Sequence, residues 1–342
     1  MKVFYHPGEQ EYRPRQSLFY GKPTPYPDVP ERTGPILRAL EARGDCEFLA
    51  PPPLDTDLAA WVHSPDYLEA LETLCGLLGA EEEFFPFLAR PTALLLQSAY
   101  PRVRMGYFAV DGSTPLVRNS HATALLGAAT AVAGAEALLA GEPLVYSLAR
   151  PPGHHAGREF YAGYCLVNNA ALAAARLSRS GRVAVLDVDF HHGNGTQDIF
   201  YDREEVLYVS LHCRPQEAYP YIAGEKDETG SGKGAGCNVN LPLPAGTDWP
   251  RYRPALERAL EKVAAFAPDS VVVSLGFDTV AGDPMGSFRL RVEEFEEMGR
   301  LIAGLGMPLL VVQEGGYLVS ALGQCALNFF AGLAAPGGKP CP

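Results

Sequence analysis

The chain has 342 residues, and its hydrophobic content of 47% is enough for one large core, so we expect a single domain over residues 1–342. Its formal net charge of −12 argues against nucleic acid as a partner and favours a cationic substrate, because an acidic surface repels phosphate. No signal segment or membrane-spanning apolar stretch is expected, and the seven cysteines show no Cys-x-x-Cys spacing. We therefore expect a cytoplasmic protein with no membrane partner.

Alternating strand and helix patterns run along most of the chain and predict an α/β fold. Strands are predicted at residues 3–6, 46–50, 144–148, 183–187, 206–211, 271–275 and 308–312. Helices are predicted at residues 29–43, 64–78, 122–140, 170–178, 249–266, 292–305 and 319–333. Strands made of nearly continuous Val, Ile and Leu are typical of a parallel sheet with helices on both faces. Residues 5–30, 81–118 and 215–236 are predicted to be irregular, and loops of this length commonly carry function or an interface.

Polar clusters follow five of the predicted strands. They lie at residues 150–157, 187–194, 212, 276–278 and 313–317. Because the carboxyl ends of parallel strands share one edge of a sheet, we expect the five clusters to meet in one cleft.

The segment after residues 183–187 carries the ligands of a predicted metal site. Side chains alternate along an extended segment, so Asp187, Asp189 and His191 point to one side. Asp278 is the natural third ligand beside Asp189 and His191, although it could instead cap a helix. Two carboxylates and one imidazole suit Zn, Fe, Co or Mn and leave room for a water whose pKa falls toward about 7. The alternative is a solvated loop after a strand.

Acid–base chemistry is predicted from the pair His154-His155, which follows a stiff Pro-Pro-Gly turn. Asp187 and Asn194 are the candidates for fixing the tautomer and orientation of the two rings. Tyr317, after two glycines, could donate its hydroxyl to a developing oxyanion. Taken singly, each histidine could be a core residue and Tyr317 a packing residue.

Four motifs, at residues 150–155, 187–195, 275–279 and 314–317, resemble the active-site motifs of the zinc-dependent histone deacetylase superfamily. The resemblance spans residues 30–332. Within the superfamily the prokaryotic acetylpolyamine amidohydrolases are most similar, on residues 29–32, 163–169 and 192–200.

The resemblance implies an arginase/deacetylase-like three-layer fold whose central parallel sheet has helices on both faces. It implies zinc, or ferrous iron, on Asp189, His191 and Asp278, with His154 and His155 as the acid–base pair and Tyr317 as the carbonyl clamp. It further implies a channel lined by Gly163, Tyr164 and Tyr219, and Arg32 beside a cavity that takes acetate. Structural potassium would be bound by Asp187, Ser210 and Leu211 with the backbone of Asp189 and His191, and a second alkali ion by the carbonyls of Phe200, Arg203 and Val206.

Two departures from the amidohydrolase pattern bear on the substrate. Residues 84–135 contain a single carboxylate, Asp111, which would bind a cationic substrate tail. Met285 resembles the lysine deacetylases at a position on the pocket wall. We therefore expect an enzyme that removes acetyl groups from small N-acetylated amines, acetylpolyamines first, with acetyl-lysine as the alternative.

Two other classes are compared with this prediction. An arginase-type ureohydrolase with two metals needs a carboxylate two residues beyond the ligand histidine, where this chain has Gly193. A binding protein without activity would be expected to lack a ligand, a base or the tyrosine, and all are present. The insertions at residues 5–30 and 81–118 predict a homodimer.

Overall fold

The computed structural model describes residues 1–19, 21–87 and 90–334. Its centre is an eight-stranded sheet in the order β4-β1-β5-β10-β9-β6-β7-β8, in which every neighbouring pair is parallel. The strands are β1 (Lys2–Phe4), β4 (Glu47–Leu49), β5 (Leu144–Ser147), β6 (Val183–Asp187), β7 (Val206–Cys213), β8 (Asn238–Leu243), β9 (Ser270–Leu275) and β10 (Leu309–Gln313).

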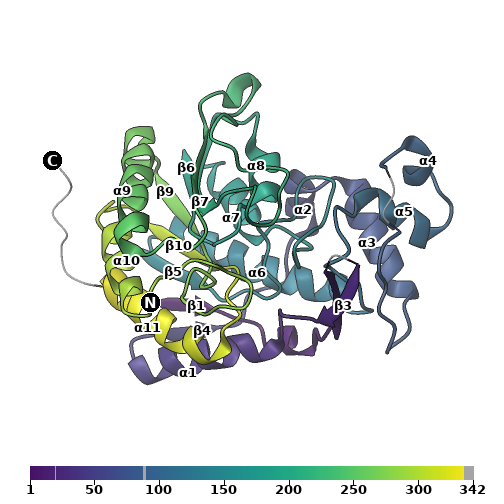
Figure 1. Ribbon diagram of the computed structural model, residues 1–342, viewed down its shortest axis with the longest axis horizontal. Helices are drawn as coiled ribbons and strands as arrows, with labels where there is room; N and C mark the ends of the chain where they lie inside the picture. Colours follow the sequence, from purple (N-terminus) through teal and green to yellow (C-terminus); the bar gives the residue numbers. More distant parts are fainter. Residues whose placement is uncertain (20, 88–89, 335–342) are drawn as a thin grey trace.

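Helices cover both faces of this sheet, as the sequence predicts (Figure 1). One core layer contains α1 (Thr33–Arg43), α9 (Trp249–Phe266), α10 (Glu294–Ala303) and α11 (Val319–Ala334). The other contains α2 (Thr56–Val62), α3 (Pro65–Leu77), α6 (Ser120–Leu139), α7 (Asn169–Leu177) and α8 (Asn194–Phe200). Val185 packs into the second layer and Leu186 into the first, because successive side chains of a strand point to opposite faces. The predicted three-layer α/β fold is confirmed.

Helix α6 corrects one expectation about membranes. With 20 residues and a mean hydropathy of 1.6, it is long and apolar enough to cross a bilayer, contrary to the expectation that no segment is. However, 67% of its apolar window is buried inside the protein, where it packs against β5 and α7. An Ala-rich helix that is buried nearly all round belongs to the core of this fold.

The segments predicted to be irregular contain regular structure as well. Residues 5–30 hold a 3-10 turn (Pro7–Glu11) and the antiparallel hairpin of β2 (Gln16–Phe19) and β3 (Lys22–Pro25), and residues 81–118 hold α4 (Ala93–Leu96) and α5 (Pro101–Phe108). Prolines and arginines mask the apolar periodicity of these short elements. Short 3-10 turns also occur at Pro30–Arg32, before α1, and at Gly232–Gly234.

Strand β8 was also missed by the sequence analysis. It carries Asn238 and Asn240, both buried, where a strand pattern would place apolar residues. The amide nitrogens of Asn238 and Asn240 donate to Gln197 and to carbonyls of the segment before β8, whereas the buried Asn238 Oδ1 has no hydrogen-bond partner in the part of the chain that the structure describes.

Candidate active site

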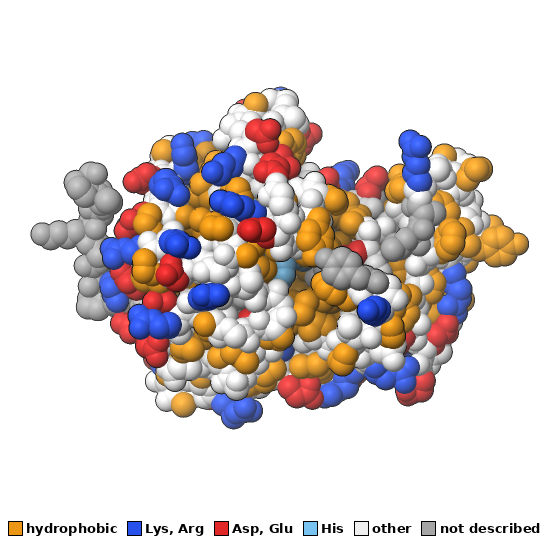
Figure 2. All heavy atoms as spheres, in the orientation of Figure 1, with side chains coloured by type: hydrophobic (Ala, Val, Ile, Leu, Met, Phe, Trp, Pro, Cys, Tyr) orange, Lys and Arg blue, Asp and Glu red, His pale blue; other side chains and the backbone are white. Residues whose placement is uncertain are grey.

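The five polar clusters meet at one edge of the sheet, because β5, β10, β9, β6 and β7 are neighbours in that order and run in the same direction. A cavity of about 670 Å³ opens there. Figure 2 shows histidine in a hollow bordered mainly by hydrophobic side chains. The residues predicted from the sequence that line the cavity are Asp111, His155, Gly163, Tyr164, His191, Tyr219, Met285 and Tyr317.

The structure brings the three predicted metal ligands together. Ligand atoms of Asp189, His191 and Asp278 all lie within 4.8 Å of one another. His191 Nδ1 is 3.2 Å from Asp189 Oδ1 and 3.0 Å from Asp278 Oδ2. Asp278 lies in a turn rather than at the start of a helix, so the alternative role as a helix cap is wrong.

Glycines leave the space in which the two carboxylates sit. A Cβ on Gly276 would lie 2.1 Å from Asp189 Oδ2, and one on Gly315 would lie 2.5 Å from Asp278 Oδ2. The Gly315 amide also donates to Asp189 Oδ2 at 2.9 Å, which orients that carboxylate. Two oriented carboxylates and an imidazole in a cradle of this size fit a divalent transition metal.

The titration of this cluster reflects two like charges that share one site. Burial and the neighbouring Asp189 raise the pKa of Asp278, whereas the imidazoles of His154 and His191 hold the pKa of Asp189 below its usual value despite burial. Burial opposes charge on His191, but its bonds to both carboxylates raise its pKa to about 9. A bound dication would reverse the shifts of Asp278 and His191 and keep the pKa of Asp189 low, since it favours ionised carboxylates and a neutral imidazole.

The histidine pair lies beside these ligands with a different partner behind each ring. His154 Nδ1 is 3.1 Å from Asp187 Oδ2, and His155 Nδ1 is 2.7 Å from Asn194 Oδ1. Because an amide oxygen only accepts, His155 Nδ1 carries the hydrogen and Nε2 is left with a free lone pair. Burial and the neighbouring His154 lower the pKa of His155, while Asp189 and Asp187 outweigh burial and raise the pKa of His154 to about 10.

Glu314 was not assigned a role from the sequence, although it lies in one of the four motifs. Its buried Oε2 accepts hydrogen bonds from the backbone amides of Gly153, at 2.7 Å, and His154, at 3.1 Å. It thereby ties the end of β10 to the turn that carries the histidine pair. A buried acid directly after an apolar strand is the signal that could have identified it.

Tyr317 lies four residues beyond the end of β10 and lines the cavity. Its amide donates to Asp283 at 2.6 Å, and its ring stacks 4.7 Å from the guanidinium of Arg32. Arg32 in turn donates to the carbonyls of Gly316 and Glu314, each at 2.6 Å. Burial raises the pKa of Tyr317 well above its usual value, so the hydroxyl stays protonated and can donate.

Gly163 and Tyr219 lie side by side in the part of the cavity wall next to His155. The Tyr219 ring packs edge-on against His155 with centroids 4.9 Å apart. Gly163 has φ +52, and a Cβ there would lie 2.4 Å from the His155 ring, so a side chain at this position would displace the base. Tyr164 packs edge-on to Tyr317 at 6.0 Å.

The residues predicted to hold alkali ions lie behind this site. Asp187 and Ser210 are cross-strand neighbours of β6 and β7, and Leu211 follows in β7. The second group lies around the turn that enters β7, where the amide of Arg203 donates to the carbonyl of Phe200 and Val206 begins the strand. Potassium binding at either place stays a prediction.

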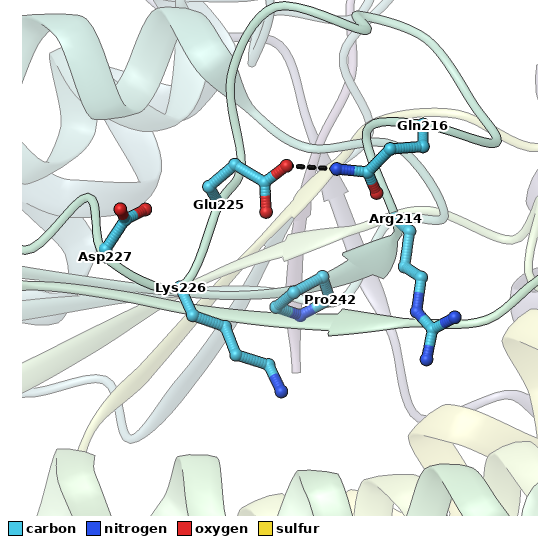
Figure 3. Close-up of a pocket in the computed structure, with 6 residues that line it drawn as sticks. All are labelled: Arg214, Gln216, Glu225, Lys226, Asp227 and Pro242. Atoms are coloured by element: carbon cyan, nitrogen blue, oxygen red, sulfur yellow. Dashed lines mark hydrogen bonds between the residues drawn. The ribbon is translucent and has the colours of Figure 1, made fainter.

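A separate pocket of about 360 Å³ shares no lining residue with the cavity (Figure 3). It is lined by Arg214, Gln216, Glu225, Lys226, Asp227 and Pro242, and the Gln216 amide donates to Glu225 across it. None of the site residues predicted from the sequence lies there.

The fold and the site define an α/β enzyme whose chemistry lies at the carboxyl ends of parallel strands. The histone deacetylase domain model matches residues 26–333, and the chain belongs to the histone deacetylase family. It is 40% identical to acetylpolyamine amidohydrolase 2 of Pseudomonas aeruginosa, over 97% of this chain and 98% of that one. It is 39% identical to the acetylpolyamine amidohydrolase of Mycoplana ramosa, over 98% and 100%. The crystal structure of an acetylpolyamine aminohydrolase from Burkholderia pseudomallei superposes with a TM-score of 0.94 at 37% identity, covering 98% of this chain and 99% of that one.

Proposed function

We propose that this protein is a metal-dependent hydrolase that removes acetyl groups from small N-acetylated amines, with acetylpolyamines as the leading substrates. The observation that carries the proposal is the meeting of three metal-ligand side chains, a neutral imidazole and a tyrosine hydroxyl at one cavity. The names of the relatives from Pseudomonas aeruginosa and Mycoplana ramosa support the substrate class.

In the proposed mechanism, Asp189, His191 and Asp278 would hold the metal. When bound, such a metal polarises a carbonyl and lowers the pKa of a water. His155 Nε2 accepts the proton of the attacking water, which is the role that its neutral state and its bond to Asn194 favour. Tyr317 donates its hydroxyl to the carbonyl oxygen as negative charge develops there. His154, whose proton Asp187 stabilises, protonates the leaving amine nitrogen.

Zinc is the metal that we propose, with ferrous iron as the alternative, since an imidazole and two carboxylates suit both ions. Structural potassium at Asp187 and Ser210 belongs to the same proposal. Cytoplasmic location is also proposed, and the cysteines of the described residues are all unpaired, as a reducing compartment favours.

Acetyl-lysine in a peptide or protein is the second candidate substrate. The presence of Met285 rather than an acid on the cavity wall favours it. The ureohydrolase is not favoured, because a Cβ on Gly193 would lie 2.3 Å from Asp187 Oδ2 and 2.5 Å from the Tyr208 hydroxyl. The backbone there has no room for the additional carboxylate that a second metal requires.

The proposed homodimer rests on the insertion at residues 81–118. Exposed apolar side chains gather there: Phe87 is 67%, Leu94 is 82% and Tyr100 is 74% exposed. Figure 1 places α4 and α5 at the opposite end of the molecule from α9 and α10, where a second copy could cover them. Exposed apolar groups of this size commonly mark an interface.

The test is kcat/KM for the metal-loaded protein with acetylputrescine, acetylspermidine, acetylcadaverine and an acetyl-lysine peptide. The proposal expects the highest value for one of the acetylated diamines or polyamines. A higher value for the peptide would favour the second candidate, and no acetate release from any of the four would refute the proposal.

A further inference from the structure

The Asp111 carboxylate is fully occupied by hydrogen bonds from the protein itself. Its Oδ1 accepts from the amide of Ser113, at 2.8 Å, and from the Ser113 hydroxyl, at 2.7 Å. Its Oδ2 accepts from the amide of Gly163, at 3.0 Å, and from the hydroxyl of Tyr219, at 2.5 Å. A carboxylate offers about four lone-pair sites, so none is left to accept a direct hydrogen bond from a substrate ammonium.

These bonds join three segments that are distant in the sequence at the part of the cavity beside His155. Gly163 and Tyr219 are adjacent parts of one wall, since a Cβ on Gly163 would lie 2.9 Å from the Tyr219 ring, and both contact the ring of His155. Asp111 is the group that holds these two parts of the wall together beside the base. Its removal would release Tyr219 from its edge-on contact with the base.

The outer part of the cavity has little else to bind a cationic tail. Among the described residues that line it, the remaining carboxylate is Glu217, whose Oε2 accepts from the amide of Ala245 at 2.8 Å. Glu217 is exposed, so water screens any pairing of its Oε1 with an ammonium and the pairing contributes little. The other side chains near the opening are largely apolar and include Leu18, Val110, which is 38% exposed, and Ile222, which is 72% exposed. These aliphatic groups can contact methylenes but cannot pair with an ammonium, and the rings of Tyr219 and Tyr221 attract an ammonium only weakly where water is present.

We propose that Asp111 is a positioning residue that braces the channel, and that the channel selects the substrate tail by apolar contact rather than by an ion pair. This inference rests on the proposed deacetylase function and specifies its substrate: an N-acetylated amine with an unbranched aliphatic tail, whose terminal charge contributes little. It replaces the expectation from the sequence that Asp111 binds a cationic tail.

The test compares acetylputrescine with N-pentylacetamide, in which a methyl group replaces the terminal ammonium of the same chain. For the wild-type protein at 0.15 M salt, we expect the two kcat/KM values to differ by less than about tenfold, whereas a direct charged hydrogen bond would favour acetylputrescine by up to roughly 10²-fold. For Asp111→Asn, we expect a loss on the order of tenfold or more for both substrates, because the wall beside His155 shifts. A loss confined to acetylputrescine would overturn the proposal.

Tyr219→Phe is a second variant, which removes the hydrogen bond from Tyr219 to Asp111 and keeps the Asp111 carboxylate. We expect it to slow both substrates in kcat more than in KM, and we expect the double variant to be no slower than Asp111→Asn. Additive losses of kcat in the double variant would show that the two residues act separately, and would contradict the proposal that Asp111 acts by positioning Tyr219. Thermal stability and metal content are measured for each variant. If the wild-type protein hydrolyses neither substrate, the proposed function itself fails. The positioning role of Asp111 is tested only when both substrates are hydrolysed, by comparing the loss of kcat/KM that each variant causes for the two substrates.

Discussion

The two adjacent histidines differ because different groups lie behind their rings. Asp187 is an anion and stabilises a proton on His154, whereas the Asn194 amide is neutral and leaves His155 as a base. Opposed pKa shifts on two groups that face the same reacting atoms are typical of an acid–base pair. The sequence placed these four residues correctly near one another, since Asp187 ends a strand and the other three follow the end of one.

At the same scale, we expect His155→Ala and Tyr317→Phe each to lower kcat by roughly 10² or more, as for a lost general base or oxyanion donor. The metal content should be unchanged, because neither residue is among the proposed ligands. Tyr161→Phe is the matched control, since the Tyr161 hydroxyl is buried without a hydrogen-bond partner and lies outside the site. Steady-state kinetics measure the effect, and near wild-type turnover in either site variant would show that its role is misassigned.

A second prediction about a single residue concerns Glu314. In Glu314→Gln the side-chain oxygen can still accept from the amides of Gly153 and His154, so we expect kcat to stay within about tenfold of wild type. In Glu314→Met both buried amides lose their acceptor, at a cost of about 1–3 kcal/mol each, and kcat should fall much further.

Comparison of kcat for the two variants checks the prediction, with Glu294→Met on α10 as a control for loss of a carboxylate. Equal losses in Glu314→Gln and Glu314→Met would mean that the negative charge matters, rather than the hydrogen bonds.

At the scale of elements, the sequence predicts the strands with buried apolar side chains most accurately. Strand β6 was predicted with its observed ends, because continuous Val, Ala and Leu between polar residues permit one interpretation. The hairpin of β2 and β3 and strand β8 were missed. Strand β3 contains two prolines and β8 contains two buried amides, so neither shows the apolar alternation from which a strand is predicted. The bonds that join Asp111 to Gly163 and Tyr219, and Glu314 to Gly153, span 52, 108 and 161 residues and leave no local pattern.

The contact between α10 and α11 gives a prediction for stability. A Cβ on Gly299 would lie 2.2 Å from the carbonyl oxygen of Phe329, so the two helices can pack only because this residue has no side chain. Gly299→Ala should therefore reduce the free energy of unfolding by about 1–3 kcal/mol, despite the better helix propensity of alanine.

Denaturant unfolding measures this change. The control is Gly76→Ala on the exposed face of α3, where a Cβ meets nothing within 4 Å and a gain of up to about 1 kcal/mol is expected. A Gly299→Ala variant as stable as the control would contradict the close approach of the helices.

At the scale of the whole molecule, the insertion at residues 81–118 is the part that the sequence described least well and that bears on assembly. We expect a homodimer in sedimentation experiments, and we expect Leu94→Asp combined with Tyr100→Asp to shift it toward the monomer, because two charges would be buried in the interface. The control is Leu139→Asp at the end of α6, where the leucine side chain is 40% exposed, and this variant should leave the dimer intact. A wild-type monomer would refute this prediction.

The most direct test of the account is a metal titration of the chelator-treated protein, followed by acetate release from acetylputrescine. Zinc should restore activity in proportion to the amount added and reach a plateau at about one ion per chain, since Asp189, His191 and Asp278 form a single three-ligand site. Activity that is retained after complete removal of metal, or that rises until two ions are bound, would contradict the assignment of a deacetylase site that uses one metal.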